Sequence, residues 1–240
     1  MPKLVLGFLV KEEIVTVKSI SPDLTSAQKM LENIYDQHDR RYFHSIEKML
    51  LKFFTTIGTF TKTKRHTKAN FGQEGKCLVN IFVWWVALCS FYKFDAADIL
   101  WKKFPGVCPY CLVAKDCNCE QQLRKISGKS LPALRLSGVR PKTIAGWQNM
   151  FRMIYGKAND QATFEYAVFR LFEEIEEVIS SIFPEVTKVD ALQLELADLG
   201  ARIFGLANKL GIDLQNQFLF YYRGVCPECL NEKCSCDSLW

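Results

Sequence analysis

The chain of 240 residues is predicted to be all-α, with two tandem helical-bundle repeats that pack together as a pseudo-dimer. Three observations predict this architecture. Apolar residues recur at helical spacing through most of the chain. The second half repeats the first at an offset of 118 residues. Each half also ends in four closely spaced cysteines, so each repeat is expected to finish in a small metal-binding turn.

The duplication is ungapped from Phe54 onward, and it aligns Phe54 with Phe172 and Asp95 with Asp213. The pattern Gly-Val-Cys-Pro-x-Cys-Leu at 106–112 occurs again at 224–230. The beginnings of the repeats need small shifts to align. The predicted organisation is an N-terminal extension (1–21), a first repeat (22–120), a linker (121–139) rich in Lys, Arg, Ser, Gly and Pro, and a second repeat (140–240).

The elements of the first half are predicted from their apolar patterns. Residues 1–21 contain β-branched runs that could form a short hairpin. Helices are expected from Thr25, over about 43–60, and over 77–92. The basic segment 62–68 is interpreted as a solvated loop, with a phosphate contact as the less favoured alternative.

The longest apolar run, residues 81–91, is 11 residues long, against roughly 20 needed to span a bilayer, so no membrane segment is expected. It is interpreted as a buried helix. Because this run is apolar on every face, it is expected to contact the second half as well as its own bundle. A large core within one domain is an equally weighted alternative.

Two acidic pairs in the second half are the candidate functional residues. Glu174 and Glu177 are three residues apart, as are Glu195 and Asp198, so each pair lies on one face of a helix. Pro184 and the segment 187–190 predict a helix stop and a capping-box-like restart, hence an antiparallel hairpin that brings the four carboxylates together. Oxygen-only ligands favour Mg²⁺ or Mn²⁺. The alternative is a solvated acidic face, the commoner role of a single such pair.

The pattern Glu-Glu-x-x-Glu at 173–177 followed by Glu-x-x-Asp at 195–198 resembles the MazG-like all-α nucleoside triphosphate pyrophosphohydrolases. The surrounding segments 154–160 and 206–213 are also similar, and some members end in a cysteine cluster. The resemblance covers about residues 141–236 and implies cleavage of a (d)NTP to the (d)NMP and pyrophosphate.

The resemblance also implies roles for individual residues. Glu174, Glu177, Glu195 and Asp198 would hold the metal ion, and Glu173 is a candidate base or second ligand. The cations nearest in sequence could steady the phosphates, although each is more often a surface residue: Arg170, Arg202, Lys209 and Arg223. Family members work as oligomers, so a pseudo-dimer within the chain is expected and a further homo-oligomer is possible.

The first repeat lacks every one of these carboxylates. At the offset of 118, its equivalent residues are Thr55, Thr56, Thr59, Cys77 and Asn80. Neutral side chains cannot supply the negative charge that a divalent cation needs. The first repeat is therefore predicted to be inactive, with the active site in the second half only.

Eight cysteines form two clusters that combine a Cys-x-x-Cys and a Cys-x-Cys motif. They are Cys108, Cys111, Cys117 and Cys119 in the first repeat, and Cys226, Cys229, Cys234 and Cys236 in the second. This spacing favours structural zinc, because four thiolates close the metal's coordination shell. Disulfides or an iron–sulfur cluster are the alternatives. Cys77 and Cys89 lie in apolar segments and are predicted to be core residues.

The net charge and the cysteine spacing restrict the ligands and the cellular location that can be expected. The net charge of +5 is compatible with anionic ligands but too weak to imply nucleic acid. No secretory leader is recognisable and the cysteine spacing fits metal thiolates, so a reducing, cytoplasmic location is expected. Two rival functions remain: a non-catalytic zinc-stapled scaffold that binds nucleic acid or protein, and a nucleotide sensor without turnover.

Overall fold

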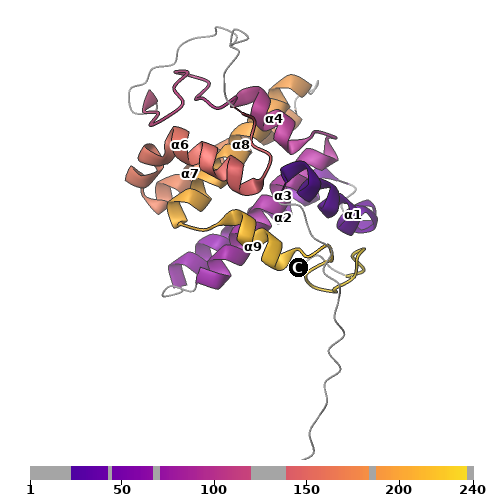
Figure 1. Cartoon of the computed structure of the whole chain (residues 1–240). Coiled ribbons are helices and arrows are strands. Elements are labelled where there is room, and N and C mark those ends of the chain that lie inside the picture. The colour runs from indigo at the N-terminus through magenta and orange to yellow at the C-terminus, as the bar shows by residue number, and fades with distance from the viewer. Residues whose placement is uncertain (1–22, 43–44, 67–70, 120–138, 184–187, 237–240) are drawn as a thin grey trace, which may run out of the picture.

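The structure is a computed structural model that describes residues 23–42, 45–66, 71–119, 139–183 and 188–236. All regular structure in these residues is helical, which confirms the predicted all-α class (Figure 1). The helices are α1 (Leu24–Tyr42), α2 (Ile46–His66), α3 (Phe71–Phe91), α4 (Ala96–Lys103), α6 (Ile144–Gln161), α7 (Phe164–Ile182), α8 (Val189–Leu210) and α9 (Leu214–Tyr221). The hairpin predicted in residues 1–21 lies outside the described residues, as does nearly all of the linker.

Equivalent positions of the two repeats have the same local structure. Asp95 and Asp213 are the N-caps of α4 and α9, and each carboxylate accepts from a backbone N–H three residues later at 2.9 Å. Gly106 and Gly224, in the turns that follow these helices, have φ of 79° and 83°, a region that favours glycine. The duplication seen in the sequence is therefore also a structural one.

The first helices of the repeats, α1 and α6, correspond at an offset of 120. Gln28 donates to the Phe94 carbonyl at 2.8 Å and accepts from the Ala96 N–H at 2.8 Å. Gln148 makes the matching pair of bonds with Ile212 and Leu214, at 2.8 and 3.0 Å. Each of these glutamine amides thus joins the first helix of a repeat to the start of its last helix. The small shift expected at the repeat boundaries is two residues.

The repeats interlock through α3 and α8. Helix α4 of the first repeat packs on α8, and α9 of the second repeat packs on α3. Trp85 on α3 is fully buried and donates its indole N–H to the Leu196 carbonyl on α8 at 2.7 Å. A single hydrophobic core runs through both repeats. The expected contact of the apolar 81–91 run with the second half is therefore present.

Gly200 lets α3 and α8 approach each other closely. A Cβ atom at Gly200 would lie 2.4 Å from the Trp85 ring and 3.2 Å from Leu100. Only glycine leaves room for the indole at this crossing, since real Cβ contacts are not that short. The position of the Trp85 ring thus depends on a residue of the other repeat.

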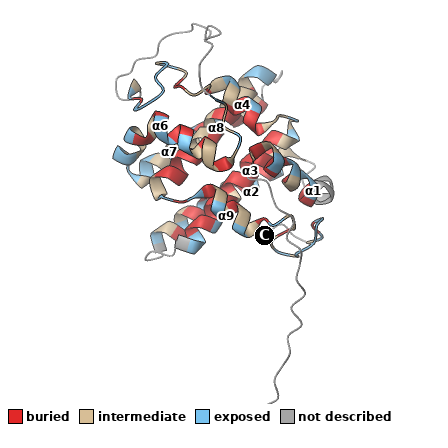
Figure 2. Ribbon diagram, in the orientation of Figure 1, coloured by how far each residue is buried: buried red, intermediate tan, exposed pale blue. Residues whose placement is uncertain are grey.

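Helix α3 is longer than the apolar run suggested. The stretch Gly72–Phe91 is, by length and composition alone, long and apolar enough to cross a membrane, and it is the only such stretch in the part of the chain that the structure describes. Most of it is buried among the other helices (Figure 2), and the core helix of a soluble protein passes the same test.

Two local predictions are wrong. The segment 62–68 was expected to be a loop, but residues through His66 form the last turn of α2. Lys64 pairs there with the buried Glu74 of α3 at 3.0 Å, a tertiary contact that extends the helix. The capping box expected at Thr187 is also wrong, because the N-cap of α8 is Lys188 and it makes no side-chain capping bond. Thr187 itself lies outside the described residues.

Candidate metal centre and cysteine clusters

The α7–α8 hairpin brings the two acidic pairs together. Helix α7 turns Leu171, Ile175 and Val178 into the core, and this places Glu174, on the same side, in a buried position. One carboxylate oxygen from each of four residues lies within 4.8 Å of the others: Glu174, Glu177, Glu195 and Asp198. We call these four residues the carboxylate cluster.

The carboxylate cluster is a set of oxygen donors that could hold a metal ion. An octahedral Mg²⁺ shell with bonds of about 2.0–2.1 Å separates neighbouring oxygens by roughly 3 Å and opposite ones by roughly 4.2 Å. The four oxygens lie within 4.8 Å of one another, close enough for one ion to contact all of them. All four donors are carboxylates, which suits Mg²⁺ or Mn²⁺ rather than a thiophilic metal.

The electrostatics of the cluster also favour a bound cation. The pKa of Glu195 is raised to about 7, mainly by burial. The positive charge of Lys103 acts to lower this pKa, and the negative charges of Asp198 and Glu177 act to raise it. Burial likewise raises the pKa of Glu174 against the lowering effect of Arg202, and that of Asp198 against the lowering effect of Lys103. The cluster is therefore an unfavourable place for several negative charges unless more positive charge is supplied.

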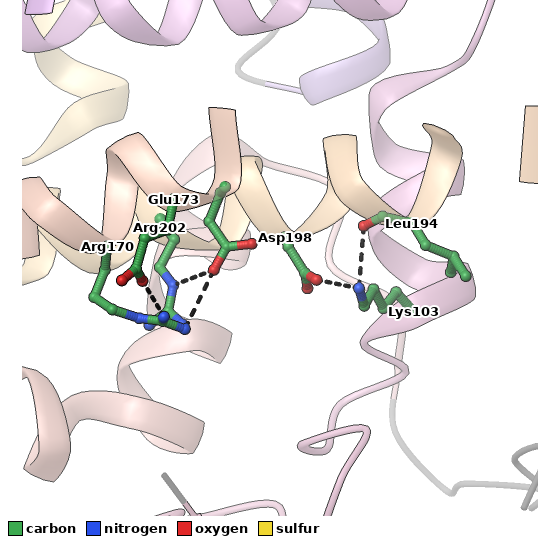
Figure 3. Close-up of polar contacts among 7 residues, drawn as sticks. Lys103, Arg170, Glu173, Leu194, Asp198 and Arg202 are labelled. Carbon is green, nitrogen blue, oxygen red and sulfur yellow. Dashed lines mark hydrogen bonds and ion pairs between the residues drawn. The ribbon is translucent and has the colours of Figure 1, made fainter. Parts of the chain in front are cut away.

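Two of the predicted cations lie beside the cluster. Arg202 donates from Nε to Glu174 Oε1 at 2.9 Å, and Arg170 Nη2 lies 3.5 Å from the same oxygen. Arg170 also pairs with Glu173, whose side chain is half exposed and is not one of the four converging carboxylates (Figure 3). Glu173 therefore lies at the edge of the site, next to an arginine.

The other two predicted cations have different surroundings. Lys209 lies on α8 eleven residues beyond Asp198, about 16 Å along the helix axis, and donates to the Asn159 carbonyl at 3.1 Å. Arg223 follows α9, donates to the Phe220 carbonyl and lies over the Phe220 ring, 5.5 Å from its centroid. The structure thus gives these two residues no contact with the carboxylate cluster.

Lys103 is a residue of the site that the sequence analysis missed. It lies in the last turn of α4, in the first repeat, and its ammonium pairs with Asp198 and donates to the Leu194 carbonyl at 3.2 Å (Figure 3). The side chains of Lys103 and Asp198 are only 12% and 13% exposed. No local motif marks Lys103, because the contact joins two repeats across 95 residues of sequence.

Tyr110 is a second contribution from the first repeat. It follows Cys108 by two residues, and burial raises its pKa to about 12 together with the negative charges of all four carboxylates. Tyr110 is 46% exposed, so it lies at the open edge of this group of charges. Its phenol remains a protonated hydrogen-bond donor at neutral pH.

In the equivalent region of the first repeat, the described residues form no such centre. Thr56 and Thr59 donate their hydroxyls back to carbonyls of their own helix, at 2.8 and 2.9 Å. Cys77 lies 3.9 Å from the hydroxyl of Thr63. Among the described residues, the groups of acidic, cysteine and histidine side chains close enough to hold an ion are the carboxylate cluster and the two cysteine clusters.

Each cysteine cluster has the geometry of a four-thiolate metal site. Within each cluster the four sulfurs lie within 4.8 Å of one another, and the close sulfur–sulfur contacts range from 3.1 Å (Cys117 to Cys119) to 3.9 Å (Cys226 to Cys236). Tetrahedral zinc with bonds of about 2.3 Å places its sulfurs roughly 3.8 Å apart. All ten cysteines are free thiols in the structure, and Cys77 and Cys89 are buried as predicted. Both clusters could therefore hold a metal ion.

The turn that carries each cysteine cluster is hydrogen-bonded to the first helix of the opposite repeat. The Cys117 N–H donates to the Ile154 carbonyl of α6 at 2.7 Å. The Cys234 N–H donates to the Ile34 carbonyl of α1, also at 2.7 Å. These carbonyls are equivalent at the offset of 120. An ion in either cluster would thus hold the two repeats together.

Comparisons with known proteins give no match: no family model, no curated protein and no solved structure is similar to this chain.

Proposed function

We propose that the chain is a Mg²⁺- or Mn²⁺-dependent nucleoside triphosphate pyrophosphohydrolase with its active site in the second repeat. The observation that carries the proposal is the convergence of four carboxylates from α7 and α8 with Arg170, Arg202 and Lys103 around them. Carboxylates bind the cation that accompanies a polyphosphate, and the two arginines complement the anionic substrate.

Glu174, Glu177, Glu195 and Asp198 would hold the metal ion, which would neutralise charge on the phosphates and lower the pKa of an attacking water. Arg202 and Arg170 lie where they could exchange their bonds to Glu174 for bonds to phosphate oxygens. Glu173, at the exposed edge of the site, could accept the proton of the water. Tyr110 could donate a hydrogen bond to a substrate oxygen.

The cysteine clusters are proposed to hold structural zinc, because four thiolates leave no position for a substrate. Zinc thiolates persist in reducing compartments, which supports a cytoplasmic location. The first repeat has a structural part in this proposal, and it supplies Lys103 and Tyr110 to the site.

The proposal is tested by incubating the purified chain with each common NTP and dNTP in the presence of Mg²⁺ or Mn²⁺. The expected products are one pyrophosphate and one nucleoside monophosphate per turnover. Release of orthophosphate instead would contradict cleavage between the α and β phosphates. Nucleotide binding without any product would favour a sensor, and the absence of both binding and turnover would favour a scaffold.

A further inference from the structure

We propose that Lys103 is a built-in cation that competes with the divalent ion for Asp198, so that the first repeat sets the metal affinity of the site in the second repeat. This inference rests on the proposed metal site and adds a function for the repeat that lacks the carboxylates of that site. Lys103 is in this sense a positioning and competing residue rather than a metal ligand.

The contacts of Lys103 support this role. Its ammonium is held by the carboxylate of Asp198 and by the Leu194 carbonyl, both on α8 (Figure 3). With only 12% of its side chain exposed, Lys103 is largely shielded from water and cannot be treated as a mobile surface lysine. The ammonium therefore supplies positive charge at a predicted metal ligand.

The duplication provides an internal comparison. At the offset of 118, the equivalent of Lys103 is Tyr221, on α9, which packs on α3 as α4 packs on α8. Tyr221 donates its hydroxyl to the Gly72 carbonyl at 3.2 Å. On α3, the equivalent of Asp198 is the neutral Asn80. A lysine is thus present where the opposite helix carries the carboxylate and absent where it does not.

Elementary electrostatics give the sign of the effect. In the absence of a divalent ion, Lys103 neutralises part of the crowded negative charge and stabilises the folded chain. When the ion binds, the ammonium and the ion are like charges at the same carboxylate and repel each other. Lys103 should therefore stabilise the metal-free protein and weaken metal binding.

The experiment compares the full zinc-loaded chain with Lys103→Met, in which the stem is kept and the charge is lost. The probe is Mn²⁺, with free ion measured by electron paramagnetic resonance at pH 8.0, above the pKa of Glu195. The Kd for Mn²⁺ is expected to fall about tenfold or more, while the metal-free variant melts at a lower temperature than wild type.

Three further variants make the result specific. Lys103→Gln, which keeps a donor for the Leu194 carbonyl, should show the same tighter Mn²⁺ binding. It replaces Lys103→Met as the test variant if the methionine variant does not fold. Lys103→Arg keeps the charge and should keep a Kd near that of wild type. Lys102→Met is the matched control, because exposed Lys102 pairs with Asp190 and Gln193 outside the cluster, and it should leave the Kd unchanged.

An unchanged or weaker Kd in both charge-removing variants would overturn the inference. A raised KM for nucleotide with an unchanged Mn²⁺ Kd would identify Lys103 as a phosphate contact and overturn it too. If Mn²⁺ binds and its Kd shifts as expected but wild type releases no pyrophosphate, the inference stands and the proposed hydrolysis fails. If neither wild type nor variants bind Mn²⁺, both fail.

Discussion

Phe54 and Phe172 occupy equivalent positions in the two repeats and stack against each other, with ring centroids 6.0 Å apart and an angle of 16° between the rings. Equivalent residues that touch must lie close to the axis that relates the repeats. Asp23 and Thr143, the residues before α1 and α6, form an antiparallel bridge. They are a second pair of equivalent residues in contact, at the beginning of each repeat. The duplicated halves are thus related by an approximate twofold axis that passes between these contacts.

Asp198→Asn is expected to reduce pyrophosphate release at least tenfold, on the order of 1.4 kcal/mol in the barrier, because a neutral amide is a poor ligand for Mg²⁺. Steady-state assays at saturating metal and nucleotide would measure this. The matched control is Asp190→Asn at the exposed start of the same helix, which should retain full activity. Retention of more than about a tenth of wild-type turnover would remove Asp198 from its proposed role.

The metal-free protein should become more stable as pH falls from about 7 toward 5. The pKa of Glu195 is raised to about 7 in the folded chain from an unfolded value of 4.5, so the folded state binds more protons across this range. The gain should be on the order of 1 kcal/mol after allowance for solvent screening. Urea unfolding with no added Mg²⁺ at pH 5.5 and 8.0 would measure it.

Glu195→Gln is the control for this pH dependence. It should flatten the profile, because the group that takes up the proton is gone. Saturating Mg²⁺ should reverse the slope, since the ion binds the deprotonated carboxylates and protons compete with it. A wild-type profile that rises with pH in the absence of added metal would contradict the assignment of a raised pKa to Glu195.

Gly200→Ala should destabilise the chain by roughly 1–3 kcal/mol, because the added methyl group would overlap the buried Trp85 ring. Equilibrium unfolding in urea would measure the change. Gly58→Ala is the matched control: nothing lies within 4 Å of its added methyl group, and alanine is the better helix former, so this variant should gain roughly 0.5–1 kcal/mol. Equal effects of the two substitutions would show that α3 and α8 are not in close contact.

The purified chain should carry two zinc ions, one in each cysteine cluster, as measured by elemental analysis. Cys226→Ser should reduce this to about one and lower stability by more than about 2 kcal/mol, since metal binding contributes directly to folding. Cys89→Ser removes a thiol from the core instead and should keep both ions. Protein purified without chelators that contains no zinc would exclude the structural-zinc assignment.

Residues 140–240 expressed alone should aggregate or self-associate, because the first repeat covers Leu196, Gly200, Phe204 and Phe218 in the intact chain. Phe204 and Phe218 are fully buried there and would become exposed. Analytical ultracentrifugation would give the association state. A fully active, monodisperse monomer would show that the second repeat does not need the first as a packing partner.

The sequence predicted the parts of the fold that depend on local pattern. Helical periodicity indicated the helix class, and cysteine spacing alone placed eight thiols in two clusters. The acidic spacing on α7 and α8 was sufficient to anticipate that Glu174 and Asp198 converge. Each of these features is a pattern among residues that are close in sequence. It can therefore be recognised without knowing which distant segments pack together.

What could not be predicted depends on contacts between distant segments. The helical end of α2 is stabilised by the pair between Lys64 and Glu74 on the next helix. Lys103 has an ordinary sequence context, and only the packing of α4 on α8 brings it to Asp198. Lys209 resembled a phosphate ligand because it is close in sequence to the cluster, but the eleven residues of α8 between it and Asp198 separate the two by about 16 Å along the helix axis.

The covalent linkage of the repeats has a genetic consequence that follows from the contact between Lys103 and Asp198. In a symmetric dimer of identical chains, every substitution appears twice, and a lysine that suits one site is imposed on the other. In this chain the equivalent positions carry Lys103 and Tyr221, and Tyr110 is matched by Glu228. One gene can therefore change the two sides of its dimer separately, so one half can specialise as a partner for the other's site without altering that site's own ligands.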